Sequence, residues 1–237
     1  MPSQIYMGVD ARRDHSMRIP RPDLSLSTGS PNACNQCHTE ESADWAYSAL
    51  LDWGVRFTGQ RNHPARAFHA ADRGDVRATA VLLETANNQA NSALLRASAI
   101  SHLNSLIPAR TASYLSLWLS SSDPLIRQAA VEAAGHLPPE QRLRILTPVL
   151  EDPVLGVRMT TAEQLAGLTA AKLSTQAERV AALNQEYRKV QSQHLDMPSV
   201  LAQLSRFQLA QGETQAAEAG LLSALQKNPQ SSVARVN

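Results

Sequence analysis

The feature that most constrains the fold is a repeat in the middle of the chain. Arg96, Arg127 and Arg158 follow one another at intervals of 31 residues. Alignment on these arginines also matches two sets of mostly apolar residues, which are Ile100 with Val131 and Ala162, and Leu106 with Leu137 and Leu168. Helical pairs with a fixed period of this size are typical of an α-solenoid, because each pair buries its apolar face only against its neighbours. The sequence therefore predicts an all-α fold of stacked helical hairpins.

Turn signals place the helices of these repeats. Asp123-Pro124 and Asp152-Pro153 are each expected to open the helix that carries the repeated arginine, with Asp as N-cap and Pro at the first helical position. The second helices are expected over residues 111–120 and 139–150. We expect the arginines to pair with the acidic cap of their own or a neighbouring repeat and to serve the structure, not a ligand. The stretch resembles HEAT-type repeats.

Further helices are predicted on the N-terminal side of the repeats. Thr39 is expected to cap the first of them, which carries acidic residues in its first turn, where the helix dipole favours negative charge. One face of this helix carries apolar residues at helical spacing, namely Trp45, Ala49, Leu50 and Trp53. We interpret the two tryptophans as core residues. Shorter helices are expected over residues 64–71 and, with Asp75 as the cap, over residues 76–86.

The apolar pattern changes near the C-terminus. From Pro198 the chain resembles one tetratricopeptide repeat: a helix, a turn at Gly212, and a second helix. Ala217 and Ala224 are small residues that let the two helices approach closely. The last residues, 231–237, have the start of a further repeat, and a solenoid needs a polar capping element to be soluble. We therefore expect the chain to be truncated there.

Residues 1–39 lack the helical periodicity of the rest. Residues 12–23 carry two prolines, and residues 25–32 continue with Ser, Thr, Gly and Pro. Proline removes a donor and biases the preceding residue away from helix, so an irregular segment is expected. A long irregular stretch inside a folded protein is usually functional or disordered. We expect a functional segment in which a bound cofactor supplies the missing apolar core.

This segment contains the sequence Cys34-Asn35-Gln36-Cys37-His38, which has the C-x-x-C-H form of c-type haem attachment. The two thiols, which are the only cysteines of the chain, would add to the porphyrin vinyl groups, and His38 would be the proximal iron ligand. Two alternatives stay open. In the first, the C-x-x-C pair is half of a zinc site, and such a site needs four N or S ligands. In the second, the two cysteines are a thioredoxin-like redox pair, and such a pair needs a β-α-β context. Haem c is the favoured cofactor.

Residues 1 to about 110 resemble the last haem-binding section of bacterial multihaem c-type cytochromes that carry C-terminal HEAT-like and tetratricopeptide repeats. The residues that carry the resemblance are Tyr6-Met7-Gly8-Val9-Asp10, Arg13-Asp14-His15-Ser16, Arg18-Ile19-Pro20-Arg21-Pro22-Asp23-Leu24 and Pro31-Asn32-Ala33-Cys34-Asn35-Gln36-Cys37-His38. In that family the segment corresponding to Met1-Pro2 typically follows another C-x-x-C-H. The resemblance thus implies that this chain starts just past a neighbouring haem site.

The resemblance also bears on the iron ligands. Cys34 and Cys37 match the thioether sites of the family, and His38 matches the proximal ligand. Multihaem cytochromes usually use a second histidine, which makes His15 the candidate for the sixth ligand of this haem or of a haem outside the chain. The competing candidates are Met17, His63 and His69. The other histidines are interpreted as solvated or core residues, and these are His102, His136 and His194.

Charge and hydropathy narrow the function classes. The formal net charge is +1, from 22 basic and 21 acidic side chains, so the chain has no electrostatic footprint for nucleic acid. No window of about 18 apolar residues predicts a membrane span. Residues 1–10 lack the pattern of a signal peptide. Because haem is attached to C-x-x-C-H outside the cytoplasm in bacteria, we expect a periplasmic or extracellular protein whose signal peptide is not present in this chain.

These observations predict three regions. Residues 1–39 are an extended haem c-binding segment, residues 40–172 are HEAT-like helical repeats, and residues 173–237 are tetratricopeptide-like helices. The predicted function is an electron-transfer module on a protein-interaction scaffold, with a redox partner protein or neighbouring haem domains as partners. The alternative is a helical-repeat interaction domain without haem. No nucleophile–base pair stands out, so the sequence favours an electron carrier over an enzyme.

Overall fold

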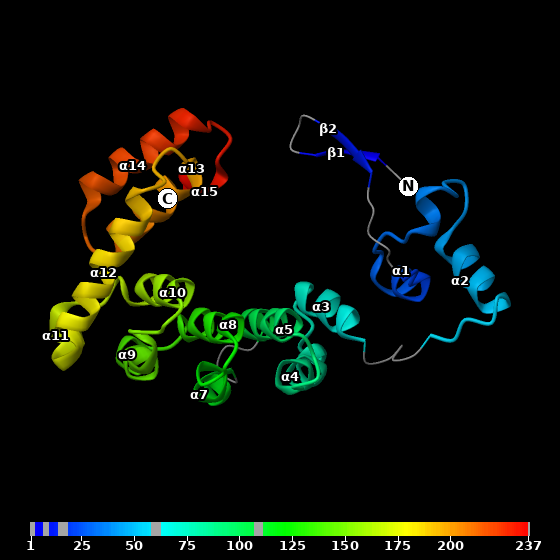
Figure 1. Ribbon diagram of the computed structural model, residues 1–237, viewed down its shortest axis with the longest axis horizontal. Coiled ribbons are helices and arrows are strands. Elements are labelled where there is room, and N and C mark those ends of the chain that lie inside the picture. Colours follow the sequence, from blue (N-terminus) through cyan, green and yellow to red (C-terminus); the bar gives the residue numbers. More distant parts are fainter. Residues whose placement is uncertain (1–2, 7–9, 14–18, 58–62, 107–110, 237) are drawn as a thin grey trace. The chain divides into compact units, whose positions relative to one another are not determined.

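The computed structural model describes residues 3–6, 10–13, 19–57, 63–106 and 111–236 (Figure 1). Within these ranges the only strands lie before residue 14, and every longer element is a helix. The predicted all-α solenoid of helical hairpins is confirmed. The chain divides into two compact units, Met1–Thr85 and Ala86–Asn237. This division rests on contacts within each unit and does not distinguish one type of repeat from another. The predicted region boundaries after residues 39 and 172 therefore stay predictions.

The second unit is a stack of helices. Its elements are α5 (Ala93–Leu106), η3 (Ala112–Tyr114), α7 (Leu115–Leu119), α8 (Pro124–Ala134), α9 (Pro139–Leu146), η4 (Thr147–Val149), α10 (Leu155–Leu165), α11 (Ala170–Leu173), η5 (Ser174–Gln176), α12 (Ala177–Ser192), α13 (Pro198–Ala210), α14 (Thr214–Lys227) and α15 (Ser232–Val236). Helix α8 packs between α5 and α10, and α10 also contacts α12. In Figure 1, α7 and α9 lie in a second row beneath α5, α8 and α10.

The register of the repeats is visible in their burial. Ile100, Val131 and Ala162, which the 31-residue period matches, are all fully buried in α5, α8 and α10. Burial of each large aliphatic side chain stabilises the fold by about 1.5–3 kcal/mol. The same position therefore supplies the core contact in successive repeats, as the alignment on the arginines predicts.

The two Asp-Pro pairs behave differently. Asp123 caps α8 as predicted: its Oδ1 accepts a hydrogen bond of 2.9 Å from the backbone N–H of Leu125, and proline follows at the first helical position. The prediction for Asp152 is wrong, because α10 begins at Leu155 with Val154 as its N-cap. The period explains the difference, since Val154 lies 31 residues after Asp123, whereas Asp152 matches Ser121.

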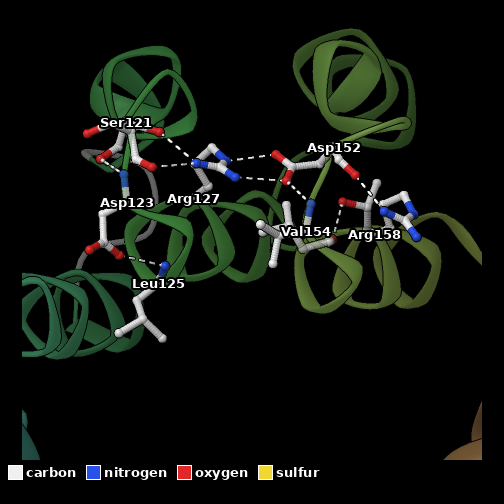
Figure 2. A network of polar contacts seen from close by, with 10 residues as sticks. Ser121, Asp123, Leu125, Arg127, Asp152, Val154 and Arg158 are labelled. Carbon is white, nitrogen blue, oxygen red and sulfur yellow. Dashed lines mark hydrogen bonds and ion pairs between the residues drawn. The ribbon is translucent and has the colours of Figure 1, made fainter.

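Two of the repeated arginines, Arg127 and Arg158, connect successive elements through polar contacts, and both reach Asp152 (Figure 2). Arg127 donates from Nε and Nη2 to the Asp152 carboxylate at 2.7 and 2.8 Å, and from Nη1 to the carbonyl of Ser121 at 2.9 Å. Arg158 donates to the carbonyl of Asp152 at 2.7 Å and to both carboxylate oxygens of Glu186 at 2.9 and 2.6 Å. Both arginines thus have an acidic structural partner, as predicted, but neither acid is the predicted helix cap: Val154 is the N-cap of α10, and Glu186 lies within α12.

Arg96 departs from this pattern. Its Nε donates to the carbonyl of Ala86 at 2.9 Å, and its Nη1 donates to Oε1 of Gln89 at 3.0 Å. The position that corresponds to Asp152 in this repeat is Ser121, which has no carboxylate. The prediction of an acidic partner is therefore wrong for Arg96, whose guanidinium binds the end of the preceding helix instead.

The C-terminal helices form the predicted hairpin. Helix α13 ends before Gly212, which has a φ of 82°, and α14 follows. Ala217 and Ala224 are fully buried in the contact between the two helices. Phe207 of α13 stacks on Tyr187 of α12 with 4.4 Å between ring centroids, which joins the hairpin to the repeats before it.

The first unit is smaller. Its elements are the antiparallel strands β1 (Ser3–Tyr6) and β2 (Asp10–Arg13), then α1 (Pro22–Thr28), η1 (Cys34–Gln36), α2 (Ala43–Asp52), α3 (Pro64–Asp72), η2 (Val76–Ala78) and most of α4 (Thr79–Asn87). Helix α1 packs against both α2 and α3. Arg21 and Asp23 form a bidentate ion pair with both contacts at 2.7 Å, and Arg66 of α3 donates to the carbonyl of Asp23 at 3.2 Å.

Two expectations for the first unit are corrected. Part of the segment predicted as irregular is regular, because Pro22 occupies the first turn of α1, where its missing N–H costs nothing. Helix α2 starts at Ala43, with Ser42 as its cap in place of Thr39, and the Ser42 Oγ accepts from the N–H of Trp45 at 3.1 Å. The helix at residues 64–71 and the Asp75 cap are confirmed.

Replacement of Arg127 by Ala should lower the free energy of unfolding by about 3–5 kcal/mol, because it leaves the buried Asp152 carboxylate without its ion-pair partner. The change is measured by urea unfolding followed by circular dichroism. The matched control is Arg77→Ala, which breaks a bidentate pair with Asp75 whose arginine side chain is 88% exposed. The control should lower the free energy of unfolding far less, because water screens an exposed ion pair. Equal losses in the two variants would contradict the role of the buried pair.

Acid should weaken the same contact. Burial raises the pKa of Asp152, but the hydrogen bonds from Arg127 and the Val154 N–H, with the charges of Arg127 and Arg158, outweigh burial and lower it overall. A folded pKa below the unfolded value of about 3.9 gives stability that is present above this value and lost as the pH falls through the folded pKa. The free energy of unfolding should therefore decrease below about pH 4, and less so in Arg127→Ala. Equal pH profiles would count against the pair.

Candidate functional site

The C-x-x-C-H sequence folds into a tight turn between α1 and α2. Cys34 to Gln36 form the 3₁₀ turn η1. The carbonyl of Cys34 accepts hydrogen bonds from the backbone N–H groups of Cys37 at 3.2 Å and His38 at 3.0 Å. This turn places Cys34, Cys37 and His38 along the lining of a single hollow.

Two asparagines hold the turn. Oδ1 of Asn32 accepts from the backbone N–H of Cys34 at 3.0 Å and of Asn35 at 3.2 Å. Nδ2 of Asn35 donates to the carbonyl of Glu41 at 2.6 Å, and Nδ2 of Asn32 donates to Oδ1 of Asn35 at 2.6 Å. Sequence reasoning gave these side chains no role. The available signal was the position of Asn32 two residues before Cys34, because Asn side chains accept from the backbone two residues onward.

The opposite wall of the hollow comes from α2. The hollow has a volume of about 220 Å³, and its α2 side consists of Trp45, Ala46, Ala49, Leu50 and Trp53. Ala46 and Leu50 are buried and form its floor, whereas Trp45 is 37% exposed and Trp53 is 78% exposed. The interpretation of the two tryptophans as core residues is therefore wrong. All four residues of the predicted apolar face line the hollow, but the two tryptophans stay exposed and Leu50 is the buried one.

The imidazole of His38 lies against this wall. The ring centroids of His38 and Trp45 are 4.8 Å apart, with 45° between the ring planes. Neither Cys34 nor Cys37 is in a disulfide. Two thiols and an imidazole are thus the chemically reactive groups of a hollow whose remaining side chains are apolar.

A zinc site gains no further ligand from the part of the chain that the structure describes. Among these residues no three His, Cys, Asp or Glu side chains come together in a group that could hold a metal ion. Two other histidines of this unit, His63 at the N-cap of α3 and His69 within that helix, do not line the hollow.

The other predicted iron ligands are placed as follows. His15 and Met17 lie outside the described residues. His63 caps α3, where its Nδ1 accepts from the N–H of Ala65 at 3.2 Å. Burial and then the charge of Arg21 lower the pKa of the His63 imidazole, which favours its neutral form. His69 is half-buried in α3.

The remaining histidines, which were interpreted as solvated or core residues, lie away from the hollow. His136 and His194 are exposed, and His102 is half-buried in α5. None of the three lines the hollow beside Cys34.

Comparison with known proteins bears on the repeats. A family model for HEAT repeats matches residues 79–167, which run from α4 to α10 and contain all three repeated arginines. The predicted resemblance of this stretch to HEAT repeats is confirmed. No curated protein matches the chain, and no solved structure matches it. None of the described helices is long and apolar enough to cross a membrane.

Replacement of Asn32 by Ala should loosen the C-x-x-C-H turn. The variant loses the side-chain acceptor of two backbone N–H groups, at a cost of about 1 kcal/mol, so the amides of Cys34 and Asn35 should exchange hydrogen about fivefold faster. Hydrogen exchange of the peptide over residues 30–42, followed by mass spectrometry, measures this change. The matched control is Asn88→Ala, which removes a contact of the same kind elsewhere in the chain. The side chain of Asn88 accepts a hydrogen bond of 2.9 Å from the N–H of Ala90, two residues onward. Unchanged exchange in Asn32→Ala would show that the asparagine does not hold the turn.

Proposed function

We propose that the chain is a c-type haem-binding electron-transfer module joined to a HEAT-type helical-repeat scaffold. The observation that carries the proposal is that Cys34, Cys37 and His38 line one hollow together with exposed tryptophans. The residue types fit the cofactor: two thiols for the thioether bonds, an imidazole for the iron, and apolar walls for the porphyrin. Haem c, bound covalently, is the proposed cofactor.

The size of the hollow is consistent with partial enclosure. Its volume of about 220 Å³ lies below the roughly 300–1,000 Å³ of pockets that surround a ligand. These residues would therefore hold one part of the ring. When bound, haem supplies one-electron transfer, and the protein tunes it through the axial ligands, burial and hydrogen bonding. Leu50 and the two tryptophans line the hollow and would exclude water from a ring held there, which is one of the means of setting a reduction potential.

The proposal for the second axial ligand rests on the resemblance to multihaem cytochromes. His15 is proposed as that ligand, for the haem of His38 or for a neighbouring haem. His63 and His69 remain the next candidates, and both lie in the same compact unit as the hollow. Covalent haem attachment in bacteria takes place outside the cytoplasm, so the proposed location is periplasmic or extracellular.

The scaffold is proposed to bind protein partners, either a redox protein or neighbouring haem domains. Its support is the HEAT match over residues 79–167, together with apolar side chains exposed at matched positions. Leu94 and Leu125 are each the second residue of their helix, 31 residues apart, and are 67% and 46% exposed. Exposed apolar groups that recur with the repeat are the kind of surface that such proteins use in binding.

Covalent haem is tested by expression of the chain behind a signal peptide in a bacterium with an active cytochrome c maturation pathway. The wild-type protein should keep haem on a denaturing gel, and its intact mass should increase by one haem. Cys34→Ala/Cys37→Ala should lose the covalent haem and keep its helical circular dichroism, because neither cysteine is in the buried core. His136→Ala, which removes an exposed imidazole far along the chain, should be loaded like wild type.

The same experiment separates the two functional alternatives. Haem that stays covalently bound in the double cysteine variant would end the proposal. Free thiols and no haem in the wild-type protein would leave the helical-repeat interaction domain as the function of this chain.

A further inference from the structure

We infer that one face of α2, formed by Trp45, Ala49 and Trp53 and called the tryptophan wall below, is the surface against which the haem ring packs, with Trp45 as the residue that positions His38. The inference rests on the proposed function and assigns roles to residues outside the C-x-x-C-H sequence. Its starting point is that all three residues of the wall line the hollow that also contains both thiols.

The exposure of Trp53 is the first argument. This indole is 78% exposed, although a tryptophan side chain carries more apolar surface than almost any other residue. The contact between α2 and the core does not need it, because Ala46 and Leu50 are the buried residues of that helix. An exposed aromatic group beside reactive side chains is typical of a binding surface.

The spacing of the wall is the second argument. Residues four apart on a helix lie on the same face, so Trp45 and Ala49 of α2 and Trp53, its C-cap residue, follow one another along one side. Ala49 is the small residue between the two tryptophans, and all three line the hollow. A flat apolar group anchored at Cys34 and Cys37 suits this side, because both thiols line the same hollow.

The contact of Trp45 with His38 is the third argument. The rings are 4.8 Å apart and tilted by 45°, which lies within the range of favourable aromatic pairs. His38 is otherwise exposed, at the end of a short turn. The indole limits the orientations of the imidazole, and the orientation of a ligating histidine affects the metal that it binds.

The test uses the full chain loaded with haem. Trp53→Ala should lower the midpoint reduction potential, because water that reaches the uncovered ring stabilises the more highly charged oxidised form. The matched control is Leu51→Ala, on the same helix, since Leu51 is 37% exposed and does not line the hollow. The control should keep the wild-type potential. Trp53→Ala that keeps its helical circular dichroism but takes up no haem, while Leu51→Ala is loaded, would also support the wall.

The positioning role of Trp45 has its own readout. Trp45→Ala should change the electron paramagnetic resonance spectrum of the oxidised haem, and Trp45→Phe should restore it, because phenylalanine keeps an aromatic ring beside His38. An unchanged spectrum in Trp45→Ala would remove that role. Equal midpoint potentials in loaded wild type, Trp53→Ala and Leu51→Ala would overturn the wall and leave the proposed function standing. A wild-type protein without haem would overturn both.

Discussion

The largely buried guanidinium of Arg127 is the contact on which the order of the repeats depends. Groups that lie before and after it in the chain meet there: the backbone carbonyl of Ser121 in the loop before its own helix, and the side-chain carboxylate of Asp152 in the loop before the next. The carbonyl of the same Asp152 then accepts from Arg158, which continues to Glu186 of α12. An arginine has five donors in a rigid plane, so one side chain satisfies a loop carbonyl and a carboxylate together. The stacking of apolar faces alone would not fix which loop lies beside which helix.

The same contacts show how far a local pattern predicts structure. The 31-residue period located the helices and the buried positions of Ile100, Val131 and Ala162, because burial in a solenoid repeats with the chain. The Asp-Pro pairs were less informative, since two identical dipeptides fall at different points of the period. The carboxylate of Asp152 binds Arg127, which lies 25 residues earlier, and a rule about local helix caps does not predict this contact. Arg96 has no acid at the equivalent position, because that position is Ser121.

At the candidate site the linear motif was predictable and its surroundings were not. Cys34, Cys37 and His38 are close in sequence, so their meeting in one hollow follows from a single turn. The role of α2 depends on which side of an apolar face meets the rest of the unit. Helical spacing places Trp45 and Leu50 on the same broad face, yet Leu50 is buried and Trp45 is 37% exposed. Periodicity assigns a face and does not say what covers it.

The small hydrophobic core of the first unit is a physical reason to expect a bound cofactor there. Among the described residues, the buried hydrophobic side chains of α1, α2 and α3 are few and half of them are small: the alanines Ala46 and Ala67 beside the leucines Leu24 and Leu50. Small side chains bury little surface, so a unit of this size gains little hydrophobic stabilisation from them. Its polar contacts, such as the pair of Arg21 and Asp23, fix geometry more than they add stability. A haem ring against the exposed tryptophans would add the large apolar contact that these helices lack, and so attachment of the cofactor would also stabilise the fold around it.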